Sequence, residues 1–494
     1  MTREQIALPG AQTHTDTHAG GSAHGIWPKL AALHNSGNPL GLLLQIARYH
    51  DGCIPLQMRS QRVFLLTEAE HFKRVLQTNG ANYTKYLDGM TPIFGGSMIT
   101  MDGALWQKMR VLQQPAFHPD MMSEYVPHFL AAIGKRKDRL TQLARSGAPV
   151  DICEETWALA ADMTCKALFD RETPFNPYFV FKAVKAFTNV TNHDSGRGQS
   201  ADGGSRDGND GKIARATGTW AALPEIILGA SPSQGRERTL LKFIEAAAAD
   251  EGVPEFDRHQ VLDEIKQYIW AGTETTALML AWALYLTAEH ADVADRIRHE
   301  ASEVFGDREP TLADYMKLTY TRNVLQETMR MYPPIWSLAR KAEAADVIGG
   351  HEIKPGDTMV LGTYVAHHNP LYWDHPDRFD PDRFAADRAK GRAPYSFLPF
   401  GGGKRACIGS TMSQIEAALA LSLFLRDFEF EYARDEAPRI NLTVTLSPKQ
   451  GLPLRIRRRA HTGTSCAAAM PRVQAARRSV RAADLEPVRP AIAG

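Results

Sequence analysis

Most of the chain carries apolar residues at helical spacing, and this pattern predicts a mainly helical protein. Residues 154–169 place apolar side chains at such intervals, and a second helix is expected at 413–425. Residues 258–290 are apolar on more than one face. A helix that is apolar all round is buried, so this segment is expected to pass through the centre of the fold.

Strand signals are short and lie mostly late in the chain. Gly349 and Gly350 separate two short β-type segments, which predicts a hairpin that residues 358–365 continue. Aromatic residues alternate with glutamates over 428–432, as in a half-buried strand. Strands and helices do not alternate, so a dinucleotide-binding sheet is not expected. The pattern predicts a mainly α fold with a small β-rich lobe.

Three segments lack the composition of a folded core. Residues 1–25 are polar, residues 194–211 contain almost nothing apolar, and residues 459–494 are rich in Ala and Arg. Such segments cannot bury enough apolar surface to offset the entropy of ordering. We therefore expect a disordered N-terminal segment, a mobile polar insert and a disordered tail.

Composition excludes several classes of protein. Of the 494 residues, 44% are hydrophobic and 23% charged, as in globular proteins. The 57 basic and 56 acidic residues nearly cancel, which gives no reason to expect nucleic acid as a partner. No run approaches the ~18 apolar residues of a membrane span. The N-terminus does not resemble a secretion signal, and five scattered cysteines suit a reducing compartment, so a cytoplasmic protein is expected.

The glycine-rich segment 400–409, which reads FGGGKRACIG, carries the strongest chemical signal. Cys407 directly precedes a predicted helix, so a thiolate there would face the positive end of the helix dipole. Gly409 would let a flat ligand approach closely, Phe400 could shield the sulfur, and Arg405 could pair with an acidic group. The alternative is a buried structural cysteine.

Phe400, Gly403, Arg405, Cys407 and Gly409 fill every fixed position of Phe-x-x-Gly-x-Arg-x-Cys-x-Gly. The segment resembles the haem-binding signature of the cytochrome P-450 family. The resemblance implies haem b with its iron bound by the Cys407 thiolate, and dioxygen as co-substrate. It also implies the family fold, with a long central helix over the haem and the cysteine loop beneath, so that 26–458 forms a single domain.

The middle of the predicted central helix contains Gly272 and three threonines, which are poor helix formers. Thr275 can donate to the carbonyl of Ala271, four residues earlier, and open the helix there. Glu274 beside Thr275 resembles the family's acid–alcohol pair. The resemblance implies that Ala271 lies against the haem, that Glu274 delivers protons, and that Thr275 stabilises the iron-bound peroxide. The alternative is a packing kink with a solvated Glu274.

Further motifs match the family in order. Trp106 and Arg110 share one helix face, and both can donate to a haem propionate. The resemblance adds Arg340 and Arg405 to this propionate-binding set. A further set, in which Glu327, Arg330 and Arg383 resemble the family's buried charge network, is expected to hold the cysteine loop in place.

These motifs predict a soluble, bacterial-type haem-thiolate monooxygenase that hydroxylates an apolar small molecule, terpenoid-like or fatty acyl. The protein is expected to be a monomer. Two alternatives stay open: a peroxide-driven or isomerising haem-thiolate enzyme, and a non-catalytic haem sensor. The pocket walls are expected at 87–99, Trp270, Ala271, Ile335 and Trp336, with Met90, Ile93, Phe94 and Met98 among the bulky residues.

Electrons are expected from a separate ferredoxin or flavodoxin and its reductase, because no flavin or iron–sulfur domain follows Arg457. A basic face would attract an acidic partner of this kind. The residues expected to form it are Lys108, Lys135, Arg136, Lys137 and Lys404. The alternative is an ordinary solvated run of charges.

Overall fold

The computed structural model describes residues 39–49, 52–58, 61–173, 176, 207–249 and 256–459. The predicted N-terminal segment 1–25 lies outside these residues, and of the predicted tail only Arg459 is described. The backbone N–H of Arg459 donates to the carbonyl of Asp427. The division of the chain into 1–25, 26–458 and 459–494 stays a prediction.

Helices dominate the described chain. The α-helices are α2 (Pro39–Tyr49), α3 (Ala69–Lys73), α4 (Thr91–Phe94), α5 (Gly103–Gln113), α6 (Pro119–Ser146), α7 (Ile152–Phe169), α9 (Asp207–Gly229), α10 (Leu240–Ala248), α11 (Arg258–Glu289), α12 (Ala291–Val304), α13 (Leu312–Lys317), α14 (Thr319–Met331), α15 (Thr363–His367), α16 (Ala386–Ala389) and α17 (Ser410–Asp427). The strands are β1 (Cys53–Met58), β2 (Gln61–Leu66), β3 (Tyr83–Lys85), β4 (Val150–Asp151), β5 (Leu338–Ala342), β6 (Asp346–Ile348), β7 (His351–Ile353), β8 (Thr358–Leu361), β9 (Phe428–Tyr432), β10 (Ile440–Leu442), β11 (Leu446–Pro448) and β12 (Pro453–Arg458).

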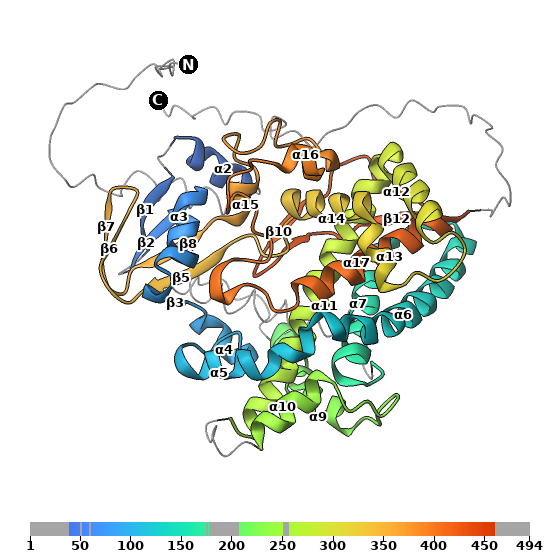
Figure 1. Cartoon of the computed structure of the whole chain (residues 1–494), viewed down its shortest axis with the longest axis horizontal. Helices are drawn as coiled ribbons and strands as arrows, with labels where there is room; N and C mark the ends of the chain where they lie inside the picture. The colour runs from blue at the N-terminus through green and yellow to red at the C-terminus, as the bar shows by residue number, and fades with distance from the viewer. Residues whose placement is uncertain are drawn as a thin grey trace.

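The long helix predicted at 258–290 is α11, which crosses the middle of the molecule (Figure 1). It begins with a capping box, in which Asp257 accepts the Gln260 N–H and the Gln260 side chain accepts the Asp257 N–H. Gly272 explains how closely α11 packs on α7. A Cβ at this position would lie 2.7 Å from the Thr164 hydroxyl oxygen. The glycine therefore serves close helix packing.

The β-rich lobe lies beside the helices in Figure 1 and contains a five-stranded sheet in the order β1-β2-β8-β5-β3. Its neighbouring strands are antiparallel, except that β2 and β8 run parallel. The predicted hairpin is confirmed as β6 and β7, and both glycines of its turn, Gly349 and Gly350, have positive φ. The predicted strand at 358–365 is too long. The chain leaves the sheet at Gly362, whose carbonyl accepts the Ala366 N–H inside α15.

Two other predicted helices are present in the structure, and one predicted loop is partly helical. Helices α7 and α17 confirm the predictions at 154–169 and 413–425, and α17 is longer at both ends. The predicted polar loop at 194–211 is wrong for its last five residues, because α9 begins at Asp207. The first turn of a helix tolerates polar residues because its N–H groups have no intrahelical acceptors. The rest of that loop lies outside the described residues.

The predicted strand at 428–432 is β9, which pairs with β12. Strand β12 also pairs with β4, and this three-stranded sheet packs near the end of α17. Among the described residues, none of the helices combines the length and the apolar character that crossing a membrane requires. The architecture is thus mainly helical with small sheets, as predicted.

Candidate active site

A cavity of about 330 Å³ lies between the middle of α11 and the cysteine loop. Residues from both sides line it, together with residues from α5, β3 and β5. The predicted site residues among its lining are Trp106, Arg110, Ala271, Thr275, Arg340, Phe400, Arg405, Cys407 and Gly409. The structure therefore brings nearly the whole predicted set to one cavity, and only Glu274 does not line it.

The cysteine loop is held in a shape that needs its glycines. The Cys407 N–H donates to the Phe400 carbonyl over 2.9 Å, which closes the loop. Gly401 and Gly403 both have positive φ, where a side chain is strained. A Cβ at Gly403 would lie 1.8 Å from the backbone oxygen of Leu76. Any other residue at Gly403 would push the loop away from its support.

Cys407 is accessible to solvent and lines the cavity, and protein atoms surround its thiol. Burial raises its pKa, whereas the Gly409 N–H and the Arg110 guanidinium act in the opposite direction. The Arg110 side chain also donates to the Ala406 carbonyl over 3.1 Å, so it sits beside the loop. The Gly409 N–H is therefore a donor to the sulfur, and a bound metal ion would supply the remaining stabilisation of a thiolate.

Cationic side chains gather in the cavity lining. The cationic residues are Lys85, Arg110, Arg340 and Arg405. Among the described lining residues, the only acidic one is Glu416. Burial, with Arg405 nearby, lowers the pKa of Arg340 to about 10. Arg405 donates to Asp102 over 2.5 Å, but its Nε has no hydrogen-bond partner in the described part of the chain. A ligand with carboxylate groups would compensate this buried positive charge.

Sequence reasoning missed Lys85, which belongs to no recognisable motif. Strand pairing places it: Lys85 lies opposite Arg340 in the antiparallel register of β3 and β5. Paired residues of neighbouring strands point to the same side of a sheet, so both side chains reach the cavity. Only the register of the sheet reveals this neighbour.

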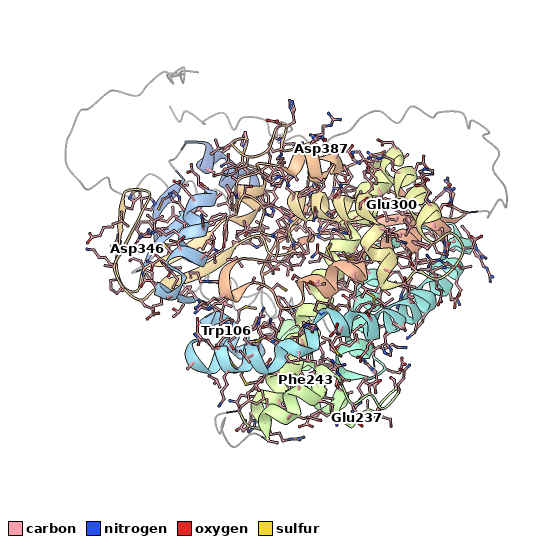
Figure 2. The ribbon with its side chains drawn as sticks, viewed as in Figure 1. Trp106, Glu237, Phe243, Glu300, Asp346 and Asp387 are labelled. Atoms are coloured by element: carbon pink, nitrogen blue, oxygen red, sulfur yellow. The ribbon has the colours of Figure 1, made fainter. Side chains whose placement is uncertain are left out.

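Trp106 lies on α5 beside the β-rich lobe (Figure 2). Its indole stands between two cations, with Lys85 Nζ and the Arg405 guanidinium carbon each 5.4 Å from the ring. Cations near an aromatic face are stabilised by its electrons. Trp106 therefore helps to keep two members of the cationic cluster (Lys85, Arg340 and Arg405) in place, namely Lys85 and Arg405.

The acid–alcohol pair on α11 divides between two environments. The Thr275 hydroxyl lines the cavity and donates to the Ala271 carbonyl over 2.6 Å, as predicted. The predicted opening of the helix is absent, because α11 stays helical through this turn. Glu274 is fully buried and accepts a hydrogen bond from the Thr445 hydroxyl over 2.8 Å. The alternative of a solvated Glu274 is wrong.

Comparison with known proteins agrees with this geometry. The family model for "Cytochrome P450" matches residues 21–197 and 228–454. The chain belongs to the cytochrome P450 family. It is 30% identical over 410 residues to cyclooctatin synthase of Streptomyces melanosporofaciens, which covers 79% of this chain and 85% of that protein. It is 26% identical over 419 residues to cytochrome P450 4X1 of Rattus norvegicus, covering 81% and 82% of the two chains.

Solved cytochrome P450 structures share the fold. The crystal structure of the cytochrome P450 CYP102L1 has a TM-score of 0.74 and 25% identity, and covers 85% of this chain and 98% of that one. The heme domain of cytochrome P450DA has a TM-score of 0.75 and 23% identity, with 88% and 96% covered. The protein is a cytochrome P450 monooxygenase with a haem cofactor, and the predicted fold is confirmed. The family assignment gives no support to the haem-sensor alternative.

The cavity of this P450 fits a haem. Cys407 presents its sulfur on one side, and the buried cations with the unpartnered Nε of Arg405 offer sites for two carboxylates. A buried carboxyl that the sequence did not indicate, Glu416 on α17, also lines the cavity. Burial raises its pKa well above the ordinary value, so a neutral carboxyl is expected there.

The predicted charge network is present and fully buried. Glu327 accepts from Arg330 over 2.7 and 2.8 Å and from Arg383 over 3.3 Å. It reaches the cysteine loop through a residue that the sequence did not indicate. Arg330 donates to the His367 carbonyl over 2.9 Å, and the His367 Nε2 accepts the Leu398 N–H over 3.0 Å. His367 thus joins the charge network to the start of the loop.

The predicted pocket walls are only partly correct. Of the predicted positions, those that line the cavity are Leu87, Met98, Ile99, Ala271 and Ile335. Met90 and Ile93 are absent from the lining, as are Phe94, Trp270 and Trp336. Phe94 instead packs 5.1 Å from the Trp270 ring, and Trp336 donates to the Thr443 carbonyl over 2.8 Å. Their bulk builds the core around the cavity rather than its surface.

The predicted basic face is weaker than the sequence suggests. Lys135 pairs with Asp162 over 3.2 Å, Arg136 with Glu155 over 2.6 Å, and Lys137 with Asp427. These acids offset the three positive charges on α6.

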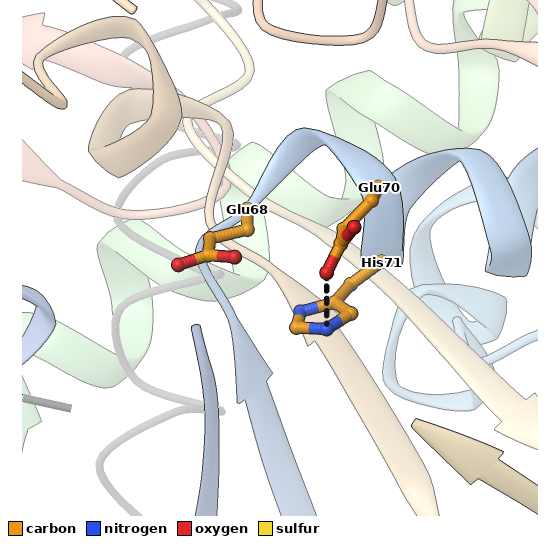
Figure 3. A group of neighbouring side chains, drawn as sticks. All are labelled: Glu68, Glu70 and His71. Atoms are coloured by element: carbon orange, nitrogen blue, oxygen red, sulfur yellow. Dashed lines mark ion pairs between the residues drawn. The ribbon is translucent and has the colours of Figure 1, made fainter. Parts of the chain in front are cut away.

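Away from the cavity lining, the described residues contain one group of three potential metal ligands, Glu68, Glu70 and His71 (Figure 3).

Proposed function

We propose that this P450 inserts one oxygen atom of dioxygen into a C–H bond of an apolar small molecule, with electrons from a separate protein. The observation that carries the proposal is the Cys407 sulfur, which opens on a cavity with Thr275 among its lining residues. Bound haem supplies the oxygen chemistry, and a thiolate ligand favours cleavage of the O–O bond. The protein supplies the ligand, the protons and a dry cavity.

The cavity residues divide into a metal ligand and a cofactor clamp. Cys407 holds the iron, and Gly409 and Phe400 lie beside the sulfur in the same loop. Ala271 bounds the cavity from α11. The propionate-binding residues are Trp106, Arg110, Arg340 and Arg405, joined by Lys85. The positive charge of this set, which Asp102 offsets only in part through its pair with Arg405, supports the assignment.

Glu274 is the proposed proton donor, and Thr275 is the alcohol proposed to act with it at the cavity. The Thr275 hydroxyl uses its proton on the Ala271 carbonyl, so its oxygen can accept a further hydrogen bond in the cavity. Glu274 is held by Thr445, outside the lining of the cavity. Transfer of a proton toward Thr275 therefore requires the Glu274 side chain to rotate away from Thr445.

The substrate is proposed to be terpenoid-like or fatty acyl. The apolar lining includes Leu87, Met98, Ile99, Leu168 and Ile335. The cations of the lining are assigned to the cofactor carboxylates, which leaves none to anchor the carboxylate of a free acid. A neutral polycyclic lipid of the terpenoid type fits this wall better than a fatty acid does.

A ferredoxin or flavodoxin is the proposed electron donor, delivered by its own reductase. Lys404 is exposed at the cysteine loop, and Lys108 is exposed on the neighbouring α5. Charge reversal at Lys404 should lower the rate of ferredoxin-supported turnover and its salt dependence. Lys390→Glu, also exposed, is the matched control. Turnover that ignores both salt and Lys404→Glu would remove this docking site.

The first experiment is the carbon monoxide difference spectrum of the dithionite-reduced holoenzyme, repeated with Cys407→Ser. A red-shifted Soret band of the thiolate type that disappears in the variant would establish Cys407 as the iron ligand. A well-folded, haem-loaded wild type without this band would overturn the proposal. Turnover that needs NADH and a redox protein, rather than added peroxide, distinguishes it from the peroxide-driven and isomerising alternatives.

A further inference from the structure

The peptide of Met98, in the wall of the cavity, is held at both of its polar groups. Its N–H donates to Glu264 Oε1 over 2.6 Å, and its carbonyl accepts from Lys85 Nζ over 2.6 Å. Glu264 comes from α11 and Lys85 from β3. Met98 and the following Ile99 both line the cavity. Two distant segments of the chain therefore hold this part of the cavity wall in place by hydrogen bonds to its backbone.

The same segment is tied to α11 at a neighbouring position. The Gly96 N–H donates to Asp263 over 2.9 Å, one residue before Glu264. Gly95 has a φ of 56°, and a Cβ there would lie 1.9 Å from the Asp263 carboxylate. Consecutive carboxylates of the central helix thus bind the loop that follows α4, and Gly95 leaves room for them.

Glu264 carries a large desolvation cost for a purely structural contact. It is fully buried, and burial raises its pKa to about 8. Burial likewise lowers the pKa of Lys85 to about 7. Both bonds survive a change of protonation, because a neutral carboxyl still accepts and a neutral amine still donates. An apolar pair would fill this space at lower cost, which favours a role for the two groups.

Lys85 connects the wall to the cofactor side of the cavity. It stands over Trp106, and its charge acts on the same cluster as Arg340 and Arg405. We propose that Glu264 and Lys85 are positioning residues that fix the wall at Met98 and Ile99, and that Lys85 couples this wall to the carboxylates of the cofactor. In the proposed function, which this inference deepens, the clamp sets the size and shape of substrate that the cavity accepts.

The first test measures hydrogen exchange of the holoenzyme by mass spectrometry. Glu264→Met should speed exchange of the peptide covering residues 95–101 by about tenfold or more, because the Met98 N–H loses its acceptor. Glu264→Gln keeps an acceptor oxygen and should restore slow exchange. Peptides of α17 should not change in either variant. Lys85→Met, which frees the Met98 carbonyl, should speed the same peptide and decides the matter if Glu264→Met does not fold.

The second test compares two ligands by spectral titration of the haem-loaded protein. Imidazole needs only the iron, whereas 4-phenylimidazole also needs the wall. Glu264→Met should change the Kd of 4-phenylimidazole by about tenfold and leave that of imidazole unaltered, whereas Glu264→Gln should behave as wild type. Unchanged exchange at 95–101 together with an unchanged ratio of the two Kd values would overturn the inference. A wild type without a thiolate-type spectrum would instead overturn the proposed function, while the exchange experiment would still judge the clamp.

Discussion

The link between His367 and the cysteine loop predicts a specific dependence of stability on pH. His367 is fully buried, and its Nε2 accepts the Leu398 N–H only while the ring is neutral. Burial, with Arg330 nearby, lowers its pKa from 6.5 to about 3. In the unfolded chain the ring titrates at its ordinary pKa. Unfolding therefore takes up a proton between about pH 6.5 and about pH 3, and stability falls as the pH falls through this range.

The magnitude follows from these two pKa values. His367 should lower the free energy of unfolding by about 1 kcal/mol at about pH 5.5 and by about 3 kcal/mol at about pH 4.5, relative to neutral pH. His367→Gln keeps an acceptor for the Leu398 N–H but does not titrate. The variant should therefore lose less stability on acidification than the wild type, by these amounts.

Urea unfolding of the haem-loaded protein, followed by far-ultraviolet circular dichroism at several pH values, measures the difference. His299→Gln is the matched control, because the His299 side chain on α12 is 76% exposed. His368, also buried with a lowered pKa, is retained in all three proteins. If wild type and His367→Gln lose stability in parallel between about pH 7 and about pH 4.5, the neutral buried ring is refuted.

Three further changes test the site. Gly403→Ala places a Cβ 1.8 Å from a backbone oxygen and should abolish the thiolate-type carbon monoxide spectrum, whereas Gly134→Ala on α6, with open space around it, should not. Glu327→Leu leaves Arg330 buried without its carboxylate and should lower the unfolding free energy by about 3–5 kcal/mol, measured in urea. Thr445→Val removes the hydroxyl that donates to Glu274, the proposed proton donor, and should change the ratio of product to NADH consumed. Thr445→Ser should preserve that ratio, and equal ratios in both variants would exclude this hydrogen bond from proton delivery.

Local patterns in the sequence predicted several elements, and the family resemblance added most of the site. The apolar character of 258–290 predicts α11 because a helix without a polar face can only be buried. The spacing of Trp106 and Arg110 places them on one face of α5, and both reach the cavity. The Thr275 hydroxyl donates a hydrogen bond to the Ala271 carbonyl because the two residues lie one helical turn apart. Each of these predictions depends only on residues that lie close together in the sequence.

Contacts between distant segments decided the rest. Lys85 reaches the cationic cluster through the pairing of β3 with β5, and His367 reaches Leu398 across 31 positions. Glu274 turns to Thr445, 171 positions away, rather than to the cavity. Apolar periodicity reports which face of an element is buried but not what lies against it, so the sequence by itself determined the fold class and the haem-binding motif. The tertiary structure alone decided which buried polar groups meet, because their desolvation is offset only by partners that the fold brings to them.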